Sequence, residues 1–238
     1  LKDKDFILAL KNSLTINVLH IIIGFPLPIA LALAIFAMKD SIFKRVTQTI
    51  SYLPHFISWV VIAGLVYKMV DYDTGSINTI IKSFGGEKIA FMREPRFFKP
   101  IMIITSIWKE IGWNTIIYLA ALSAIPSEQY EAAIVDGATG PQRLWYITLP
   151  SIAPTISLML IMTVGNLVTG NFDSIYNTRN PMLADTADTL EYFSFAEGIL
   201  RSKYSYSTAI GLAQGLVNLV LVMTANGVSR KLQGYGAF

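Results

Sequence analysis

The sequence contains no cysteine and only two histidines, His20 and His55. The lack of cysteine excludes a disulfide framework, a thiolate metal site and a thiol nucleophile. The two histidines are too far apart in the sequence for a zinc site of the HExxH type, so no metal ion is expected. The sequence also has no run of five like charges, although its net charge is +3. Nucleic acid is therefore not expected as a partner.

Charged residues are also scarce. They make up 15% of the 238 residues, whereas 53% are hydrophobic, and the mean hydropathy is +0.50. A soluble domain typically contains about 25% charged residues. The deficit moves the composition toward that of a chain dissolved in lipid, in which about 20 consecutive apolar residues form a membrane-crossing helix. The composition favours an integral membrane protein over a protein with a single soluble core.

Five stretches are long and apolar enough to be membrane spans. Pro26, Pro28 and Pro54 are expected to kink the first two, because proline lacks a backbone N–H. The predicted fold class is all-α: a polytopic helical bundle of five spans, surrounded by membrane lipid. The predicted spans are Leu14–Met38, Tyr52–Val70, Ile101–Ile125, Leu149–Leu167 and Thr208–Asn226.

With five spans, the connecting segments fall into two sets on opposite sides of the membrane. The first set comprises 39–51, 126–148 and 229–238, and the second includes the longer connections 71–100 and 172–207. By raw count the second set holds more lysine and arginine. The basic residues closest to the span ends nevertheless favour a cytoplasmic position for the first set. These residues are Lys39, Lys44, Arg45, Arg230 and Lys231.

The connection between the third and fourth spans predicts a helix, a turn and a second helix. Ser127 is a good N-cap for a short helix that runs to Asp136. Gly137 is a natural C-terminal stop, and Gly140-Pro141 supplies a second helix start with proline at the first position.

The first of these short helices has an acidic polar side. Tyr130, Ala133 and Ile134 share one face, whereas Glu131 and Asp136 project elsewhere. Two interpretations are a helix lying on lipid headgroups and a docking element for a soluble partner. A headgroup-bound helix usually carries lysine and arginine on its polar face. The acidic face therefore favours docking to a basic cleft on a protein.

Seven residues between positions 131 and 150 have a characteristic spacing: Glu131, Ala132, Ala133, Gly137, Ile147, Leu149 and Pro150. In this spacing the segment resembles the EAA motif of binding-protein-dependent ABC transporter permeases. Segments 52–58, 116–122 and 204–209 are similar to the LplB-like branch of sugar permeases, which handles complex oligosaccharides. The resemblance covers essentially the whole chain. It implies a single transmembrane domain, 1–238, of the MetI-like type I ABC importer fold in a bacterial cell membrane.

The resemblance also implies what segment 126–150 does and which partners it needs. In the family this segment is the cytoplasmic coupling loop, which inserts into a groove on an ATP-binding subunit. The implied partners are a second permease subunit in a heterodimer, two cytoplasmic ABC ATPase subunits and an extracytoplasmic solute-binding lipoprotein. The sequence has no GxxxxGK[ST] motif, so ATP and Mg²⁺ are expected on the ATPase and no cofactor on this chain. The implied coupling residues are Glu131, Ala132, Ala133, Asp136, Gly137, Leu149 and Pro150.

Polar residues within the predicted spans are candidates for a substrate path, because a charged side chain at the bilayer centre costs about 2.5–3.5 kcal/mol on insertion scales. An indole there can stack on a sugar ring, and amides can meet hydroxyl groups. The alternative is that these residues form ion pairs and interhelical hydrogen bonds that hold the bundle together. His20 and His55 are expected to be structural. The path candidates are Lys109, Glu110, Trp113, Asn114, Asn166, Asn171, Gln214 and Asn218.

Other functional classes fit the sequence less well. A secondary transporter is expected to show inverted repeats, and a membrane enzyme a cluster of catalytic groups. The sequence shows no such repeat or cluster, so no catalytic residue is predicted, while an ABC permease for a non-sugar solute stays an alternative. Members of the resembling family carry one more span before the region matched by Leu1. The five predicted spans are therefore expected to correspond to the second to sixth of six helices.

Overall fold

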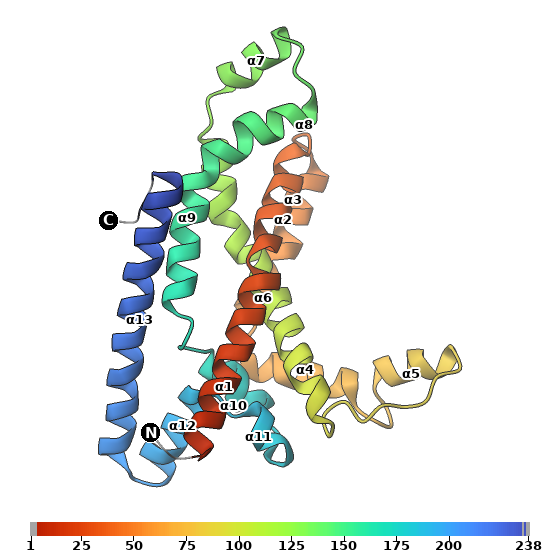
Figure 1. The fold of residues 1–238 in the computed structure, drawn as a ribbon. Coiled ribbons are helices and arrows are strands. Elements are labelled where there is room, and N and C mark those ends of the chain that lie inside the picture. Colours follow the sequence, from red (N-terminus) through yellow and green to blue (C-terminus); the bar gives the residue numbers. More distant parts are fainter. Residues whose placement is uncertain (1–3, 235, 237–238) are drawn as a thin grey trace.

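The computed structural model describes residues 4–234 and 236. Throughout this part of the chain the regular secondary structure is helical, without strands. Figure 1 shows an elongated bundle whose long helices run between two ends. Helices α7 (Ser127–Val135) and α8 (Gly140–Arg143) lie at one end, here named the α7 end. Helices α11 (Ala184–Ala187) and α12 (Leu190–Phe195) lie at the other, the α12 end.

The first long helical run starts earlier than predicted, at Lys4 instead of Leu14. It extends over 34 residues to Ala37 and contains one π-helical turn. This turn ends at Gly24, two residues before Pro26, whose missing N–H prevents a regular helical hydrogen bond. The predicted proline kink therefore takes the form of a widened turn within a continuous run. Its parts are α1 (Lys4–Leu19), η1 (His20–Gly24) and α2 (Pro26–Ala37).

The predicted span Tyr52–Val70 is not one continuous helix. The helix breaks at Ile57 and Ser58, where the backbone is extended, and the two halves meet at an angle of 100°. Pro54 lies in the 3-10 turn before the break, and the Ser58 hydroxyl caps the following helix. The parts are α3 (Ile42–Tyr52), η2 (Leu53–Phe56) and α4 (Trp59–Val70).

Helix α3 occupies most of the segment 39–51, which was predicted to be a loop. It is amphipathic: its apolar side chains recur at helical spacing, but lysine, arginine and threonine residues lie between them. Its composition is consequently too polar for a hydropathy-based prediction of a span, and only the spacing of its apolar residues indicates a helix. The apolar residues are Ile42, Phe43, Val46 and Ile50.

The prediction of five spans is not confirmed. Among the described residues, three helical runs are long and apolar enough to cross a membrane, or four if the bent pair α3–α4 forms one span. Helix α6 (Pro95–Ser123) has 29 residues, enough length to cross, but Lys109 and Glu110 contribute to a more polar composition. The three runs are Lys4–Ala37, Gly140–Gly165 and Tyr204–Lys231.

The remaining helical segments are the rest of the second apolar run, the helix of the third run, and the short helices of the connections. Helix α9 packs against α13 along the bundle, and α2 packs against α6. The segments are α5 (Ser76–Ser83), η3 (Leu144–Thr148), α9 (Leu149–Gly165), α10 (Phe172–Thr178), η4 (Pro181–Leu183), η5 (Ala196–Leu200) and α13 (Tyr204–Gln233).

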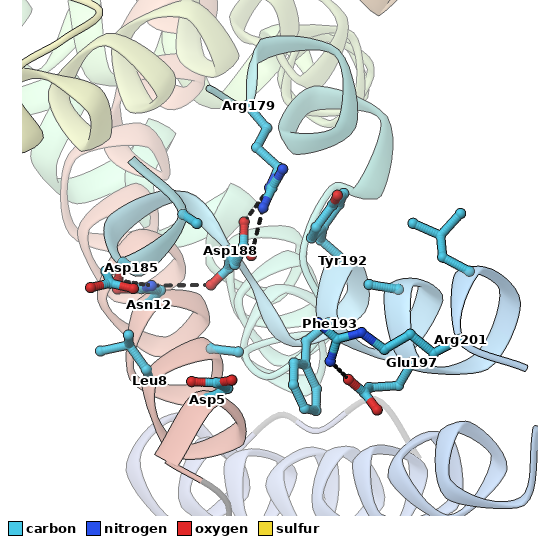
Figure 2. Close-up of a pocket in the computed structure, with 14 residues that line it drawn as sticks. Asp5, Leu8, Asn12, Arg179, Asp185, Asp188, Tyr192, Phe193, Glu197 and Arg201 are labelled. Atoms are coloured by element: carbon cyan, nitrogen blue, oxygen red, sulfur yellow. Dashed lines mark hydrogen bonds and ion pairs between the residues drawn. The ribbon is translucent and has the colours of Figure 1, made fainter. Parts of the chain in front are cut away.

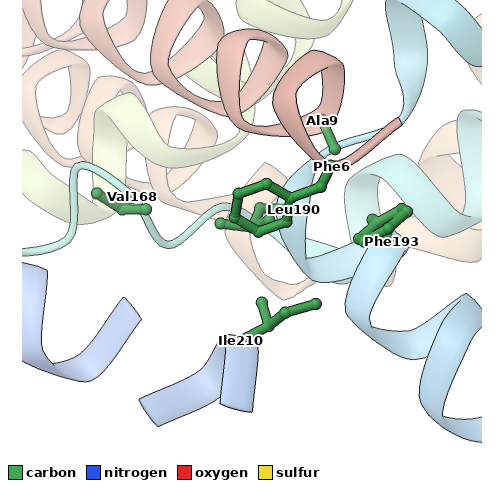
Figure 3. Packing of buried hydrophobic residues seen from close by; sticks show 6 residues of the cluster. All are labelled: Phe6, Ala9, Val168, Leu190, Phe193 and Ile210. Carbon is green, nitrogen blue, oxygen red and sulfur yellow. The ribbon is translucent and has the colours of Figure 1, made fainter. Parts of the chain in front are cut away.

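Most of the buried apolar residues that the structure describes belong to three clusters along the bundle. One lies between α2, α6 and α9 and contains Ala32, Tyr118 and Leu122. A second joins α6 to α10 and α11. The third lies at the α12 end, where Figure 3 shows Phe6, Leu190, Phe193 and Ile210 converging with Ala9 and Val168. Much of α13 remains exposed, including Leu212, Leu216 and Val220.

Candidate functional site

The segment 126–150 forms the predicted helix, turn and second helix. The N-cap of helix α7 is Pro126 instead of the predicted Ser127, which is already the first helical residue. Gly137 has a φ of +80°, a conformation that favours glycine, and it stops α7 as predicted. Thr139 and Gln142 form a capping box at the start of α8.

The predicted coupling residues are largely uncovered. Glu131, Ala132, Asp136 and Gly137 are exposed, and Ala133 is half-buried. Pro150 is exposed and Leu149 half-buried at the start of α9, behind the short helices. An open hollow of about 310 Å³ lies between α7 with its following turn on one side and α8 with η3 on the other. Its lining residues are Ala133, Asp136, Gly137, Ala138, Gln142, Arg143, Tyr146 and Ile147.

Apolar side chains also project at the α7 end. Val135 is 87% exposed, Ile134 is exposed, and Trp145 and Tyr146 on η3 are exposed as well. Exposed apolar groups rimmed by polar residues mark a surface that contacts another protein or a membrane. Ile134 had been predicted to share a face with Tyr130 and Ala133, but it is exposed whereas the other two are half-buried.

Lys109 lies at the helix break between α3 and α4. Its side chain is buried, with 6% of the residue exposed. The ammonium group donates to the backbone carbonyls of His55 and of Ile57, the latter at 3.0 Å. These carbonyls are left without helical partners where η2 ends, and a cation suits the negative end of a helix. In this structure Lys109 therefore stabilises the break.

Glu110 and Trp113 surround His55 at the same break. The Glu110 carboxylate lies 2.8 Å from Nδ1 of His55, and the rings of His55 and Trp113 stack with centroids 4.3 Å apart. Glu110 also lies 3.8 Å from the Lys109 ammonium group. These contacts are the interhelical interactions that the sequence left as one of two interpretations.

Asn114 lies on a different side of α6 from Lys109 and Trp113. It lines a small cavity of about 80 Å³ against α2 and α9. Asn166 lines a larger hollow of about 320 Å³. His20 and Thr163 line both spaces, so the two adjoin. The structure thus brings together two of the predicted path residues in one polar region of the bundle.

The other three path candidates lie around the segment 167–171, which follows α9. The Gln214 amide donates to the Val168 carbonyl at 3.4 Å, and the Asn218 amide donates to the Thr169 hydroxyl at 2.6 Å. Asn171 caps α10 by accepting from the Ser174 N–H at 3.1 Å. Gln214 and Asn218 thus tie α13 to the segment that follows α9, and Asn171 starts the next helix.

Sequence reasoning missed Asn17 and Thr163 and assigned His20 a structural role only. Asn17 lines the larger hollow and donates to the carbonyls of Leu167 and Thr169 at 2.7 and 3.0 Å. Asn17 and His20 are polar residues three positions apart within an apolar run, and this pattern could have indicated both as candidates for the substrate path.

A pocket at the α12 end is lined by charged side chains that pair with one another. Figure 2 shows Arg179 facing Asp188, with Nη2 and Oδ2 3.1 Å apart, and Asn12 reaching the backbone carbonyls of Asp185 and Asp188. Arg179 also lies over the ring of Tyr192, 4.4 Å from its centroid. Asn12 thus joins α1 to the ends of α11, and Arg179 joins the end of α10 to Asp188 and to α12.

Glu191 is a titratable group at this end, on the same helix as Tyr192. Burial raises the pKa of Glu191 to about 7, and the Gly170 N–H offsets part of this rise. The carboxylate packs so closely against Gly170 that a Cβ there would lie 2.9 Å from Oε2.

Residues 24–233 match the family described as "Binding-protein-dependent transport system inner membrane component". Protein LplB of Bacillus subtilis (strain 168) is 39% identical over 236 residues, which cover 99% of this chain and 74% of LplB. The polygalacturonan/rhamnogalacturonan transport system permease protein YteP of the same organism is 40% identical with the same coverage.

The fold also matches a solved structure of a transporter. A chain in the crystal structure of a bacterial alginate ABC transporter, in complex with alginate pentasaccharide-bound periplasmic protein, superposes with a TM-score of 0.94 at 39% identity. The match covers 99% of this chain and 82% of that one. The helical fold and the membrane-crossing runs agree with a multi-pass transport permease. This chain therefore belongs to the family of binding-protein-dependent transport system inner membrane components.

Proposed function

We propose that this chain is a permease subunit of an ATP-driven importer and that segment 126–150 is its contact with a cytoplasmic ATPase. The supporting observation is the exposure of α7 and its motif residues at one end of the bundle. Glu131 offers a carboxylate to a basic groove, and Ala132 permits close approach of another backbone. The lack of a GxxxxGK[ST] motif is the reason for assigning ATP and Mg²⁺ to that separate subunit. The α7 end is then the cytoplasmic end, in line with Lys39, Lys44 and Arg45 beside it.

The proposed substrate is an oligosaccharide from a plant or algal polysaccharide, delivered by an extracytoplasmic solute-binding lipoprotein. The names of the relatives support this class, since YteP is named for polygalacturonan and rhamnogalacturonan and the solved transporter for alginate. A second permease subunit would complete the path in a heterodimer. The polar hollows beside His20, Asn114 and Asn166 are the part of the path that we assign to this chain.

The proposed mechanism is alternating access. Closure of the ATPase pair around ATP displaces α7, and this displacement opens the path toward the binding protein. Release of the ATPase pair reverses the movement and exposes the path to the cytoplasm. Amide, imidazole and hydroxyl groups in the hollows exchange hydrogen bonds with sugar hydroxyls without holding them tightly.

The test is ATP hydrolysis by the assembled transporter, stimulated by the binding protein loaded with a mixed digest of polygalacturonan, rhamnogalacturonan and alginate. Glu131→Lys reverses the charge at the proposed contact, and Gly137→Pro is incompatible with the positive φ of the turn. We expect each to reduce the stimulated rate at least about tenfold. For Glu131→Lys the reason is that a like charge against a basic groove costs several kcal/mol, and for Gly137→Pro it is the disruption of the turn that follows α7.

The matched control is Glu87→Lys, an equally exposed carboxylate on the segment between α5 and α6. It is expected to leave the stimulated rate within about twofold of wild type, as is usual for surface substitutions. Stimulated hydrolysis that survives both α7 substitutions would rule out the coupling role. A digest that never stimulates hydrolysis would instead rule out the substrate class.

A further inference from the structure

Helix α7 contains no buried residue, so few side chains hold it against the bundle. Tyr130 is one that does. Its hydroxyl lies 3.0 Å from Oγ1 of Thr148, 18 positions further along the chain. Its ring lies against the ring of Phe36, with centroids 6.4 Å apart. Tyr130 thus touches both η3 and the last turn of α2.

Both contact residues are themselves fixed in the bundle. Thr148 is 5% exposed, and its hydroxyl lies 3.3 Å from the Arg143 carbonyl within the η3 turn. Phe36 packs against the buried cluster between α2, α6 and α9 that contains Tyr118 and Leu122. A displacement of Tyr130 would therefore push on well-packed residues of two membrane-crossing runs.

The chain connections of α7 are less suited to this task. Segment 124–126 joins α7 to α6, and the turn around Gly137 joins it to α8. Short irregular links transmit a pull but leave the orientation of a helix free. A tyrosine has few rotatable bonds and combines a large apolar ring with one hydrogen bond, so it fixes orientation at a small entropic cost.

We infer that Tyr130 is a positioning residue that locks α7 onto α2 and η3, so that displacement of α7 by the ATPase is transmitted to the membrane-crossing helices. The inference rests on the proposed function of segment 126–150. It assigns the transmission to a side chain on the inner face of α7, whereas Glu131 on the outer face is assigned to the ATPase contact.

The experiment compares sugar uptake with ATP hydrolysis in proteoliposomes that contain the assembled transporter, with the binding protein and the mixed digest outside. The quantity measured is the amount of sugar imported per ATP hydrolysed. Tyr130→Phe keeps the ring and removes the hydroxyl. We expect this ratio to fall about threefold to tenfold, the equivalent of one lost hydrogen bond, with assembly unchanged. Tyr130→Ala also removes the contact with Phe36, and a larger fall is expected.

Substitutions of Thr148 test the same contact from its other side. Thr148→Ser keeps the hydroxyl and is expected to retain the wild-type ratio, whereas Thr148→Val is expected to resemble Tyr130→Phe. Both substitutions remove the bond between Tyr130 and Thr148, and Thr148→Val also removes the bond to the Arg143 carbonyl. The double variant should therefore be no worse than Thr148→Val alone. Tyr204→Phe, an exposed tyrosine at the start of α13, is the control and should leave the ratio unchanged.

The outcomes separate this inference from the proposed function. A wild-type ratio in Tyr130→Phe and in Tyr130→Ala, while Glu131→Lys abolishes stimulated hydrolysis, would overturn the role of Tyr130 and leave the coupling contact intact. Stimulated hydrolysis that persists in Glu131→Lys would overturn the coupling contact itself. If Tyr130→Ala does not assemble, Tyr130→Phe decides the question.

Discussion

At the α12 end, Phe6, Phe193 and Ile210 are buried together, whereas at the α7 end helix α7 contains no buried residue. The two ends also differ in the range of their polar contacts. Asn12 donates to the carbonyl of Asp185, 173 positions away, while Thr139 and Gln142 bond within one helical turn. The α12 end is held by long-range tertiary packing, whereas the α7 end is held mainly by contacts within segment 126–150, with the ring contact between Tyr130 and Phe36 as a long-range link. We expect the α12 end to determine stability and the α7 end to determine coupling.

The largest effect on stability is expected from Phe193→Ala at the α12 end. Phe193 is buried, and its ring meets those of Phe6 and Tyr206 at centroid distances of 6.1 Å each. Removal of a buried phenylalanine ring costs about 3–5 kcal/mol, because it leaves a cavity. The measurement is the thermal unfolding midpoint of the purified chain in detergent. Phe84→Ala, at a position that is 87% exposed, is the control and should change stability by less than about 0.5 kcal/mol. Equal effects of the two substitutions would contradict the stabilising role of this cluster.

The difference between the ends also explains what the sequence could predict. At the α7 end the structure depends on local rules: Gly137 stops a helix, and proline follows Gly140 at the next start. Such rules act within a few residues and can be found by reading along the chain. The same holds for the long apolar runs, because hydropathy is a local property.

The interactions at the α12 end and at the helix break could not be found in this way. The position of Lys109 within a predicted span indicates that its charge needs partners. These partners are backbone carbonyls at the break between α3 and α4, more than fifty residues away. The segment 172–207 was predicted only as a connection between spans, yet its part up to Leu200 folds into short helices that bury Leu190 and Phe193 against α1. Each of these helical elements has at most seven residues, too short for a clear periodic signal, and only the docking of distant helices decides which apolar residues are buried.

Glu191→Gln is expected to have a smaller effect on stability, and this effect depends on pH. The folded chain holds a proton on Glu191 up to about pH 7, above the ordinary value of 4.5, because the carboxyl is buried. The bound proton therefore stabilises the folded chain fully below the ordinary pKa of 4.5, and this stabilisation is lost as the pH rises through about 7. We expect wild type to lose on the order of 1–2 kcal/mol relative to Glu191→Gln between pH 5 and pH 8. Unfolding midpoints across this range measure the difference. Glu87→Gln, an exposed carboxyl, should follow wild type, and a wild-type slope in Glu191→Gln would contradict the assignment.

The smallest effect on stability is expected at the α7 end, from Glu131→Lys. The side chain is exposed and is assigned to the ATPase, so its replacement removes no contact that holds the chain together. Like most surface substitutions, it should change the free energy of unfolding by less than about 0.5 kcal/mol. The midpoint is measured on the purified chain under the conditions used for Phe193→Ala. A loss comparable to that of Phe193→Ala would mean that α7 takes part in the stable packing of the bundle, and the contrast between the two ends would fail. An unchanged midpoint, combined with lost stimulation of ATP hydrolysis in the assembled transporter, would separate function at this end from the stability of the fold.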